Sequence, residues 1–226
     1  SDLHGTFVPW DYSTDTENLA GSLSQIATQV RKVRSEQPNV ILVDAGDTIQ
    51  GNFVETFKHD KTSPMILGFN ALDYDVWVMG NHEFDFGLEN VARVFKRLNF
   101  PIVCANYRFH ECGLDKIVKP YVILKRKGLK IGVFGLSPKL DGLVDHKNYR
   151  STEYLDPVKT AQEMVDLLKK KHCDLIICIS HLGWEEKGMG DQKLISHTRG
   201  IDLVLGGHSH TYFKQLRYVN NLDGKP

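Results

Sequence analysis

The apolar residues of the chain recur in two alternating patterns. In the first, Leu23, Ile26, Val30 and Val33 are three or four residues apart, which places them on one side of a helix over residues 19–35. In the second, the apolar run at 39–43 is short and continuous, as in a buried parallel strand. The same patterns predict further helices at 64–72, 88–98 and 157–171, and further strands at 76–79, 101–104, 175–179 and 203–205.

Two more apolar runs, 121–124 and 129–134, flank a charged turn and predict a β-hairpin. A hairpin adds an antiparallel pair, so we expect a sheet that is not purely parallel. Elsewhere the order is strand, polar loop and helix, several times over, which specifies an α/β protein with helices on the outside. In such folds ligands bind beyond the carboxyl ends of the strands. No internal repeat, low-complexity segment or linker interrupts this order.

Acids and histidines gather at those strand ends. Short segments rich in glycine, aspartate and asparagine follow the predicted strands, and one more lies at the N-terminus. These segments contribute Asp2, His4, Asp47, Asn81, His82, Asp85, His181, His208 and His210. Each segment taken alone has an ordinary explanation as a turn, a helix cap or a core histidine. The case for a shared site rests on their combination and on their order along the chain.

The donor types in these segments indicate a pair of metal ions. Mixed imidazole and carboxylate donors suit zinc, manganese, iron or nickel better than calcium or a structural zinc site. Two Asp, one Asn and up to four His side chains could bind metal. Seven such side chains are too many for one tetrahedral ion that keeps an open position. They suit two ions that share a carboxylate, which is the usual arrangement for in-line displacement at phosphorus. With Asp2, Asp47 and a bridging hydroxide, such a site stays net positive and suits an anionic phosphate ester.

Composition narrows the range of functions. The chain has 226 residues, 41% hydrophobic and 25% charged, which suits one globular domain rather than a disordered segment. Its 28 Lys and Arg residues are balanced by 28 Asp and Glu residues. This balance argues against a nucleic-acid polymer or a membrane surface as partner, because both attract excess positive charge. No apolar run reaches about 18 residues, so we expect no membrane span. The remaining histidines are expected on the surface, at His59, His110, His146, His172 and His197.

Four cysteines are too few for a disulfide scaffold in a chain of this length. We expect buried thiols at Cys104 and Cys178, which end apolar runs. A disulfide between Cys112, in a polar loop, and Cys173, after a helix, stays open. Among the aromatic residues we expect Trp77 in the core, and we take Trp10, Tyr12 and Trp184 as candidates to border the site.

Five motifs in this order resemble a known family. They are D-x-H-G at the N-terminus, G-D-x-x-Q-G at 46–51, G-N-H-E-F-D at 80–85, a histidine at a strand end and G-H-S-H at 207–210. Together they resemble the calcineurin-like metallophosphoesterases, nearly end to end. The segments 44–51 and 80–87 look like the 5′-nucleotidase branch, which includes UDP-sugar hydrolases and 2′,3′-cyclic-nucleotide phosphodiesterases.

The resemblance implies a four-layer αββα sandwich of metallo-dependent phosphatase type, with two mixed sheets face to face. It also implies roles for individual residues. The first metal is expected on Asp2, His4, Asp47 and His210, and the second on Asp47 as the bridge, Asn81, His181 and His208. His82 matches the catalytic histidine next to the leaving group, and Asp85 matches the carboxylate that orients it. Asn81 and His82 are also expected to contact substrate.

The resemblance further implies an enzyme that uses two divalent ions, Mn²⁺, Zn²⁺ or Fe²⁺, to hydrolyse phosphate esters, above all nucleotides. A metal-bridging hydroxide would attack phosphorus in line. Family members are mostly exported to the periplasm or the cell surface. They normally carry a strand before D-x-H, closing strands after G-H-S-H and often a C-terminal nucleotide-specificity domain. We therefore expect residues 1–226 to be a single catalytic domain truncated at both ends, with that specificity domain absent or supplied by a separate chain.

Two alternatives stay open. The same fold could hydrolyse an anionic ester that is not a nucleotide, since relatives of this branch cleave other anions, including a sulfur ester. A metal-binding scaffold could instead recognise phosphoanions or partner proteins without turnover. His82 and Asp85 favour an enzyme over the scaffold, because a pure scaffold needs neither residue and both are present.

Overall fold

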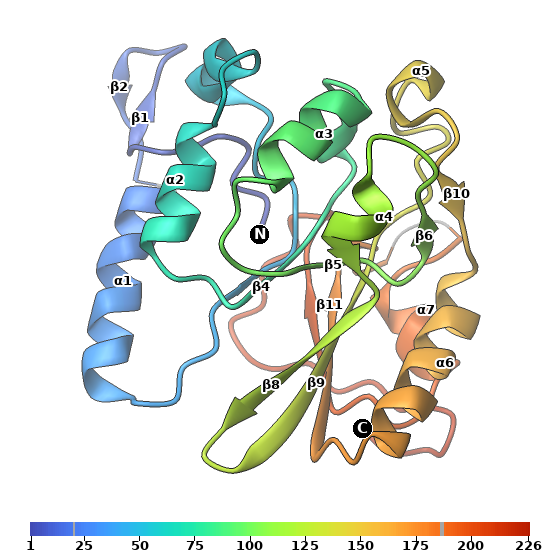
Figure 1. Ribbon diagram of the computed structural model, residues 1–226. Coiled ribbons are helices and arrows are strands. Elements are labelled where there is room, and N and C mark those ends of the chain that lie inside the picture. Colours follow the sequence, from blue (N-terminus) through green and yellow to red (C-terminus); the bar gives the residue numbers. More distant parts are fainter. Residues whose placement is uncertain (20, 186–187) are drawn as a thin grey trace.

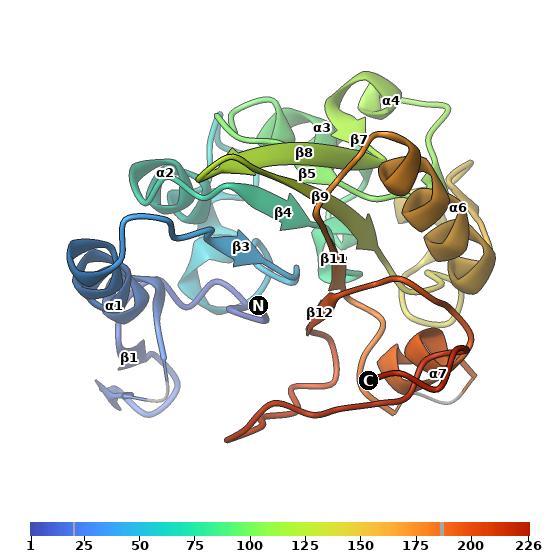
Figure 2. The ribbon, with the colours of Figure 1, turned by 90° about the horizontal axis from the view of Figure 1, so that it is seen from below.

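Two four-stranded sheets lie face to face at the centre of the molecule, as the computed structural model shows for residues 1–19, 21–185 and 188–226 (Figures 1 and 2). One has the order β3 (Val43–Asp44), β4 (Val76–Val78), β5 (Ile102–Val103) and β7 (Val118–Lys119). The other has the order β12 (Leu203–Gly206), β11 (Leu175–Ser180), β9 (Leu129–Leu136) and β8 (Tyr121–Arg126). Short antiparallel pairs join β1 (Trp10–Asp11) to β2 (Thr16–Glu17) and β6 (Tyr107–Arg108) to β10 (Glu153–Tyr154).

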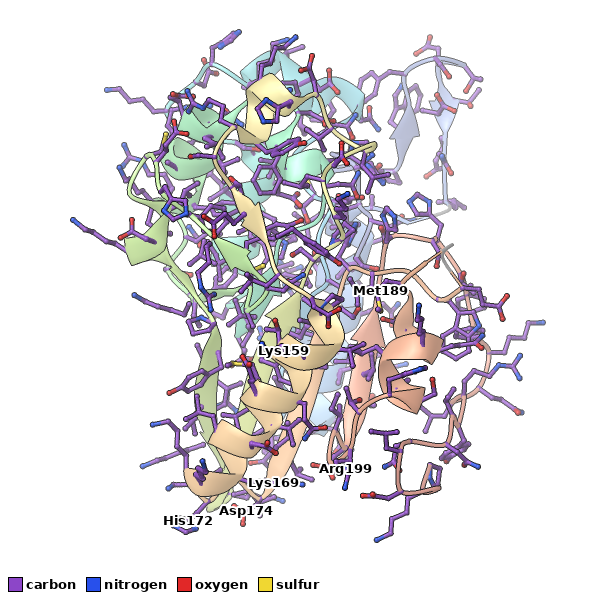
Figure 3. The ribbon with its side chains drawn as sticks, turned by 90° about the vertical axis from the view of Figure 1, so that its right-hand side faces the viewer. Lys159, Lys169, His172, Asp174, Met189 and Arg199 are labelled. Atoms are coloured by element: carbon purple, nitrogen blue, oxygen red, sulfur yellow. The ribbon has the colours of Figure 1, made fainter. Side chains whose placement is uncertain are left out.

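Helices cover the outer face of each sheet (Figure 2). The first sheet carries α1 (Leu23–Glu36), α2 (Pro64–Ala71), α3 (Leu88–Phe95) and α4 (Leu114–Ile117). The second carries α6 (Pro157–Lys170), seen from its exposed side in Figure 3, and α7 (Asp191–Ser196). The remaining turns are α5 (His146–Tyr149) and the 3₁₀ helices η1 (Asn52–Phe57) and η2 (His82–Phe84).

Side-chain alternation along the strands builds three apolar layers. One lies between the two sheets, and the others lie between each sheet and its helices. Successive residues of a strand point to opposite faces. In β4, Val76 and Val78 therefore pack between the sheets with Val133 of β9, whereas Trp77 packs outward among the helices. In β9, Phe134 turns the other way and packs under α6. The expected four-layer α/β sandwich is thus confirmed, and so is the buried position of Trp77.

Gly135 sets how closely the two sheets approach. A Cβ atom there would lie 2.4 Å from the Val103 oxygen and 2.7 Å from Val78 Cγ2, both in the facing sheet. We expect Gly135→Ala to lower the free energy of unfolding by about 1–3 kcal/mol, because the sheets must separate to admit the methyl group. Urea denaturation measures this loss. Lys125→Ala, at an exposed position of β8, is the control and should change stability by less than about 0.5 kcal/mol.

The strand directions differ in part from the expectation of two mixed sheets. The second sheet is mixed, since the predicted hairpin β8–β9 is antiparallel while β9–β11 and β11–β12 are parallel. In the first sheet the three pairs are all parallel. The reason is that helices α2, α3 and α4 each return the chain to the same end of the sheet before the next strand begins, as parallel pairing requires.

Several predicted elements have different bounds: the helix expected at 88–98 ends at Phe95, the strand expected at 101–104 is Ile102–Val103, and two others differ more. The helix expected from residue 19 begins at Leu23, because the Ser22 side chain caps it by accepting the Gln25 N–H, and residue 20 lies outside the described part of the chain. The strand expected at 39–43 is reduced to Val43–Asp44. There the Leu42 N–H donates to the Asp75 carboxylate at 2.8 Å, so the backbone ladder does not extend further.

The expectations for the buried thiols and the surface histidines are confirmed, and the structure answers two further questions. Cys104 and Cys178 are buried, and all four cysteines are free thiols, so Cys112 and Cys173 do not form a disulfide. The surface histidines are exposed, including His172 beyond the end of α6 (Figure 3); the others are His59, His110, His146 and His197. Within the described residues, no helix has the length and apolar character needed to cross a bilayer.

Candidate metal centre

The N-terminal segment lies along the loop that follows β3. Its backbone donates from Asp2 to the Gly46 oxygen at 2.8 Å, from His4 to the Asp47 oxygen at 2.9 Å and from Gly5 to Thr48 at 3.0 Å. These three hydrogen bonds hold Asp2 and His4 beside Asp47. The loops after β4, β11 and β12 meet at the same place, as expected for the carboxyl ends of the strands.

A first group of donors consists of Asp2, His4 and His210, whose candidate ligand atoms lie within 4.8 Å of one another. The two Nε2 atoms of His4 and His210 are 3.1 Å apart, and His210 Nε2 is 3.6 Å from Asp2 Oδ1. The other ring nitrogen of His4, Nδ1, lies 3.1 Å from the Gln50 side-chain oxygen. If Nδ1 donates to that oxygen, Nε2 carries the lone pair and faces the group.

A second group consists of Asp47, His181 and His208. The buried His181 ring donates from Nδ1 to the Ala45 carbonyl, so its Nε2 is the atom that takes a proton or a metal ion. This Nε2 lies 2.9 Å from Asp47 Oδ2. Burial alone would lower the pKa of His181, but the neighbouring Asp47 carboxylate raises it above the ordinary value. The position between the two side chains therefore favours positive charge.

Two buried polar atoms of this centre make no well-aligned hydrogen bond among the described residues: Asn81 Oδ1, and His181 Nε2, which lies close to Asp47 Oδ2 without the alignment of a hydrogen bond. Buried polar groups are almost always paired, so such orphans need an explanation. A neutral oxygen and an imidazole nitrogen are both metal donors. The residues present therefore fit a bound cation.

Asp47 links the two groups. Its Oδ2 is 2.9 Å from His181 Nε2 in the second group and 4.0 Å from His4 Nε2 in the first. Burial opposes ionisation of Asp47, yet His181 and the His82 N–H outweigh it and hold the pKa of the carboxyl below its ordinary value. An ionised carboxylate between two donor groups is what a shared ligand requires.

His82 lies at the edge of this centre and is paired with Asp85. Its Nδ1 is 2.7 Å from Asp85 Oδ2, and this hydrogen bond is the main cause that raises the pKa of His82 above its ordinary value. The His82 ring also stands edge-on to the His4 ring, with centroids 5.2 Å apart. His82 forms a further possible donor group with His4 and Asp47. Because Nδ1 is engaged by Asp85, only Nε2 of His82 is free to face a ligand.

Glycines leave the room that these side chains occupy. A Cβ atom on Gly80 would lie 2.2 Å from Asp47 Oδ1 and 2.6 Å from His181 Nε2. A Cβ atom on Gly207 would lie 3.1 Å from both Asp2 Oδ2 and His181 Nδ1. The glycines of the G-N-H-E and G-H-S-H motifs are therefore required by packing against the donors.

Sequence reasoning missed two residues that support this centre. Glu83, inside the G-N-H-E motif, is fully buried. It accepts hydrogen bonds from backbone N–H groups of the loop after β3, at Asp47, and of the loop after β4, at Gly80. Burial, with the nearby Asp47 charge, raises the pKa of Glu83 to about 7. Gln50 is the second, through its contact with His4. The signal for Glu83 was a charged residue between a site histidine and an apolar phenylalanine, but the residue types alone do not show what it contacts.

The three aromatic candidates lie in different places. Trp184 lines a cavity of about 840 Å³ that Asp2 and His210 also line, so it borders the centre. Trp10 and Tyr12 line another hollow, formed with Val8, Pro9 and Glu17 around the β1–β2 pair, to which none of the candidate donors contributes.

Comparison with known proteins agrees with this geometry. The family model for calcineurin-like phosphoesterases matches residues 1–212. The chain belongs to this family. Its members depend on metal ions, in keeping with the donor groups at the strand ends.

Three relatives show how much of a protein this catalytic fold occupies. The chain is 32% identical over 245 residues to the trifunctional nucleotide phosphoesterase protein YfkN of Bacillus subtilis, covering 97% of this chain and 17% of YfkN. It is 32% identical over 243 residues to the 2′,3′-cyclic-nucleotide 2′-phosphodiesterase/3′-nucleotidase of Haemophilus influenzae, covering 98% of this chain and 37% of that protein. It is 33% identical over 202 residues to the 5′-nucleotidase of Bos taurus, covering 88% of this chain and 34% of that protein.

A solved structure is similar in three dimensions. The crystal structure of YfkN superposes with a TM-score of 0.83 at 31% sequence identity, covering 95% of this chain and 72% of that one. The calcineurin-like phosphoesterase therefore shares its fold with a relative over nearly its whole length, while it spans well under half of the length of the relatives matched by sequence.

Proposed function

We propose that the chain hydrolyses phosphate esters, above all nucleotides, at a centre for two divalent metal ions. The observation that carries the proposal is the meeting of two donor groups at Asp47, with the His82–Asp85 pair beside them. The groups Asp2, His4, His210 and Asp47, His181, His208 have no member in common, which supports two ions, and a third group, His4, Asp47 and His82, spans both. Asp47 serves both, since its Oδ2 is within 4.0 Å of His4 and 2.9 Å of His181.

The assignment of residues follows from these groups. One ion would be held by Asp2, His4, His210 and Asp47, and the other by Asp47, Asn81, His181 and His208. Mn²⁺, Zn²⁺ and Fe²⁺ are the ions that suit this donor set. Such ions supply Lewis acidity, which lowers the pKa of water and neutralises charge on phosphoryl oxygens.

The protein's own groups bind and orient the substrate. Asn81 contributes a neutral oxygen, so it adds no negative charge that would repel a phosphate. His82 holds a proton at Nε2 and donates it to the departing alkoxide oxygen. Asp85 accepts from Nδ1 at 2.7 Å, which fixes the ring orientation. With a second proton on Nε2, His82 is the imidazolium, and the raised pKa of His82 favours this form.

The His82–Asp85 pair also supports catalysis over a metal-binding scaffold. A scaffold needs donors for its ions but no histidine that a carboxylate orients beside them. His82 lies at the edge of the centre, with its ring close to His4, where a leaving group could reach it. An anionic ester other than a nucleotide remains the second candidate.

The names of the relatives support nucleotides as the substrate class. The Haemophilus relative is named for cyclic nucleotides and 3′-nucleotides, and the Bos taurus relative for 5′-nucleotides. Because these proteins are much longer than this chain, a nucleotide-specificity domain, in the same protein or a separate chain, is part of the proposal. The exported, periplasmic or cell-surface location implied by the family is part of it as well.

Phosphate release tests the proposal directly. We expect the Mn²⁺-loaded chain to release phosphate from 5′-AMP, or to open 2′,3′-cyclic AMP, because both place an anionic phosphorus at the metal centre. Chelator should remove the activity, and added Mn²⁺ should restore it. Colorimetric phosphate and chromatographic product assays measure the two reactions. Two bound ions per chain without turnover of either substrate would contradict the nucleotide assignment, and turnover that survives chelator would contradict the metal mechanism.

A further inference from the structure

Glu83 is a buried carboxylate that belongs to none of the candidate donor groups found among the described residues. Its side chain is completely buried. Its Oε1 accepts from the Thr48 N–H at 2.7 Å and from the Ile49 N–H at 3.4 Å. Its Oε2 accepts from the Asp47 N–H at 3.0 Å and from the Gly80 N–H at 2.6 Å. One side chain thus satisfies four backbone donors from two loops.

The two loops that Glu83 joins are those that carry the donors of the second group. The loop after β3 presents Asp47, and the loop after β4 presents Asn81. No strand pairing joins these loops, because the β3–β4 ladder ends at Asp44 and Trp77. Beyond the end of the ladder, the Glu83 carboxylate joins the two loops by hydrogen bonds, and it fixes the spacing between Asp47 and Gly80.

The backbone of Asp47 needs such support. Its φ is 57°, in the left-handed region that favours glycine. The Glu83 bond to the Asp47 N–H, together with the Asp47 Oδ1 bond from the His82 N–H at 2.9 Å, holds the residue in this conformation. As a result the Oδ2 atom is turned toward His181.

From these contacts we propose that Glu83 is a positioning residue that assembles the metal centre before any ion binds. Its carboxylate holds the Asp47 loop and the Asn81 loop in the geometry that receives a cation, so little reorganisation is left for the binding step. The inference rests on the proposed function, because what Glu83 positions is the proposed metal centre.

Glu83→Gln tests this role with almost no change in size. A glutamine amide has one accepting oxygen, and its NH₂ group only donates. Whichever way it is turned, two of the four backbone N–H groups face a donor. We expect the affinity for Mn²⁺, measured by isothermal titration calorimetry, to fall about 10–100-fold, as for other residues that orient metal ligands.

Glu55→Gln is the matched control. Glu55 accepts one backbone N–H, that of Gly51 at 2.9 Å, in the neighbouring loop, and it does not contact Asp47. The affinity of the Glu55→Gln variant for Mn²⁺ should stay within about twofold of the wild-type affinity. Equal affinities in the wild type and Glu83→Gln would overturn the inference while leaving the proposed function intact. A wild-type chain that binds no Mn²⁺ would instead overturn the proposed function and the inference with it.

Hydrogen exchange of the metal-free wild type gives a second test that does not depend on whether Glu83→Gln folds. If Glu83 assembles the centre in advance, the amides of residues 47–49 and 80 are protected without metal and gain little when Mn²⁺ is added. Amides that exchange freely until Mn²⁺ is added would overturn the inference, because the ion and not Glu83 would then order the loops.

Discussion

Gly80→Ala is expected to weaken Mn²⁺ binding by at least about 100-fold while leaving the fold in place. The added Cβ atom would lie 2.2 Å from Asp47 Oδ1 and 2.6 Å from His181 Nε2, so it would displace donors of the second group directly. Changes that only disturb the support of a ligand already cost about 10–100-fold, and this one acts on the ligands themselves. The backbone of Gly80 is not in the left-handed region, so alanine adds no backbone strain.

Calorimetric titration with Mn²⁺ measures the affinity, and thermal unfolding of the metal-free protein measures the stability. Gly135→Ala is the matched control, because it adds the same methyl group between the sheets and away from the donors. We expect Gly80→Ala to lose affinity with little loss of stability, and Gly135→Ala to lose stability with unchanged affinity. Wild-type affinity in Gly80→Ala would mean that the cation does not sit between Asp47 and His181.

Hydrophobic patterning predicted the long elements because they bury one regular face. The helix Pro157–Lys170 and the hairpin of β8 and β9 lie close to their predicted positions. The shorter elements depend on contacts that no local pattern encodes. The strand at Val43–Asp44 is short because the Leu42 N–H bonds to Asp75, more than 30 residues further along the chain. The pairing of β6 with β10 likewise joins Tyr107 to Tyr154 across a long separation.

The candidate site was predictable because each donor lies in a short motif at a strand end. The structure brings Asp2, His4, Asp47, His181, His208 and His210 into donor groups, and it leaves Asn81 Oδ1 buried without a partner among the described residues. Glu83 was not predictable in this way. Its importance lies in four backbone N–H groups, and every residue type other than proline has that group. Sequence identifies side chains that do chemistry more readily than those that hold a backbone.

His82→Ala should separate the chemistry of the leaving group from that of the metal centre. With 5′-AMP the leaving group is an alkoxide that needs a proton, so loss of the His82 Nε2 donor should lower kcat about 10²–10⁴-fold. With 4-nitrophenyl phosphate the departing phenolate is stable without a proton, and the loss should be much smaller. Metal affinity should stay near the wild-type value, because the proposed ligand sets do not include His82.

His110→Ala is a matched control for this experiment. His110 also pairs with a carboxylate, with Nε2 3.0 Å from Glu153 Oε1, but both side chains are exposed and His110 follows the end of β6 rather than lying at the metal centre. Its removal should leave both substrates unaffected. An equal loss of activity on the two substrates in His82→Ala would mean that His82 positions the phosphate or a metal ion and does not protonate the leaving oxygen. His82 also shares a donor group with His4 and Asp47. A parallel fall in Mn²⁺ affinity would therefore mean that His82 positions a metal ion, and unchanged affinity would mean that it positions the phosphate.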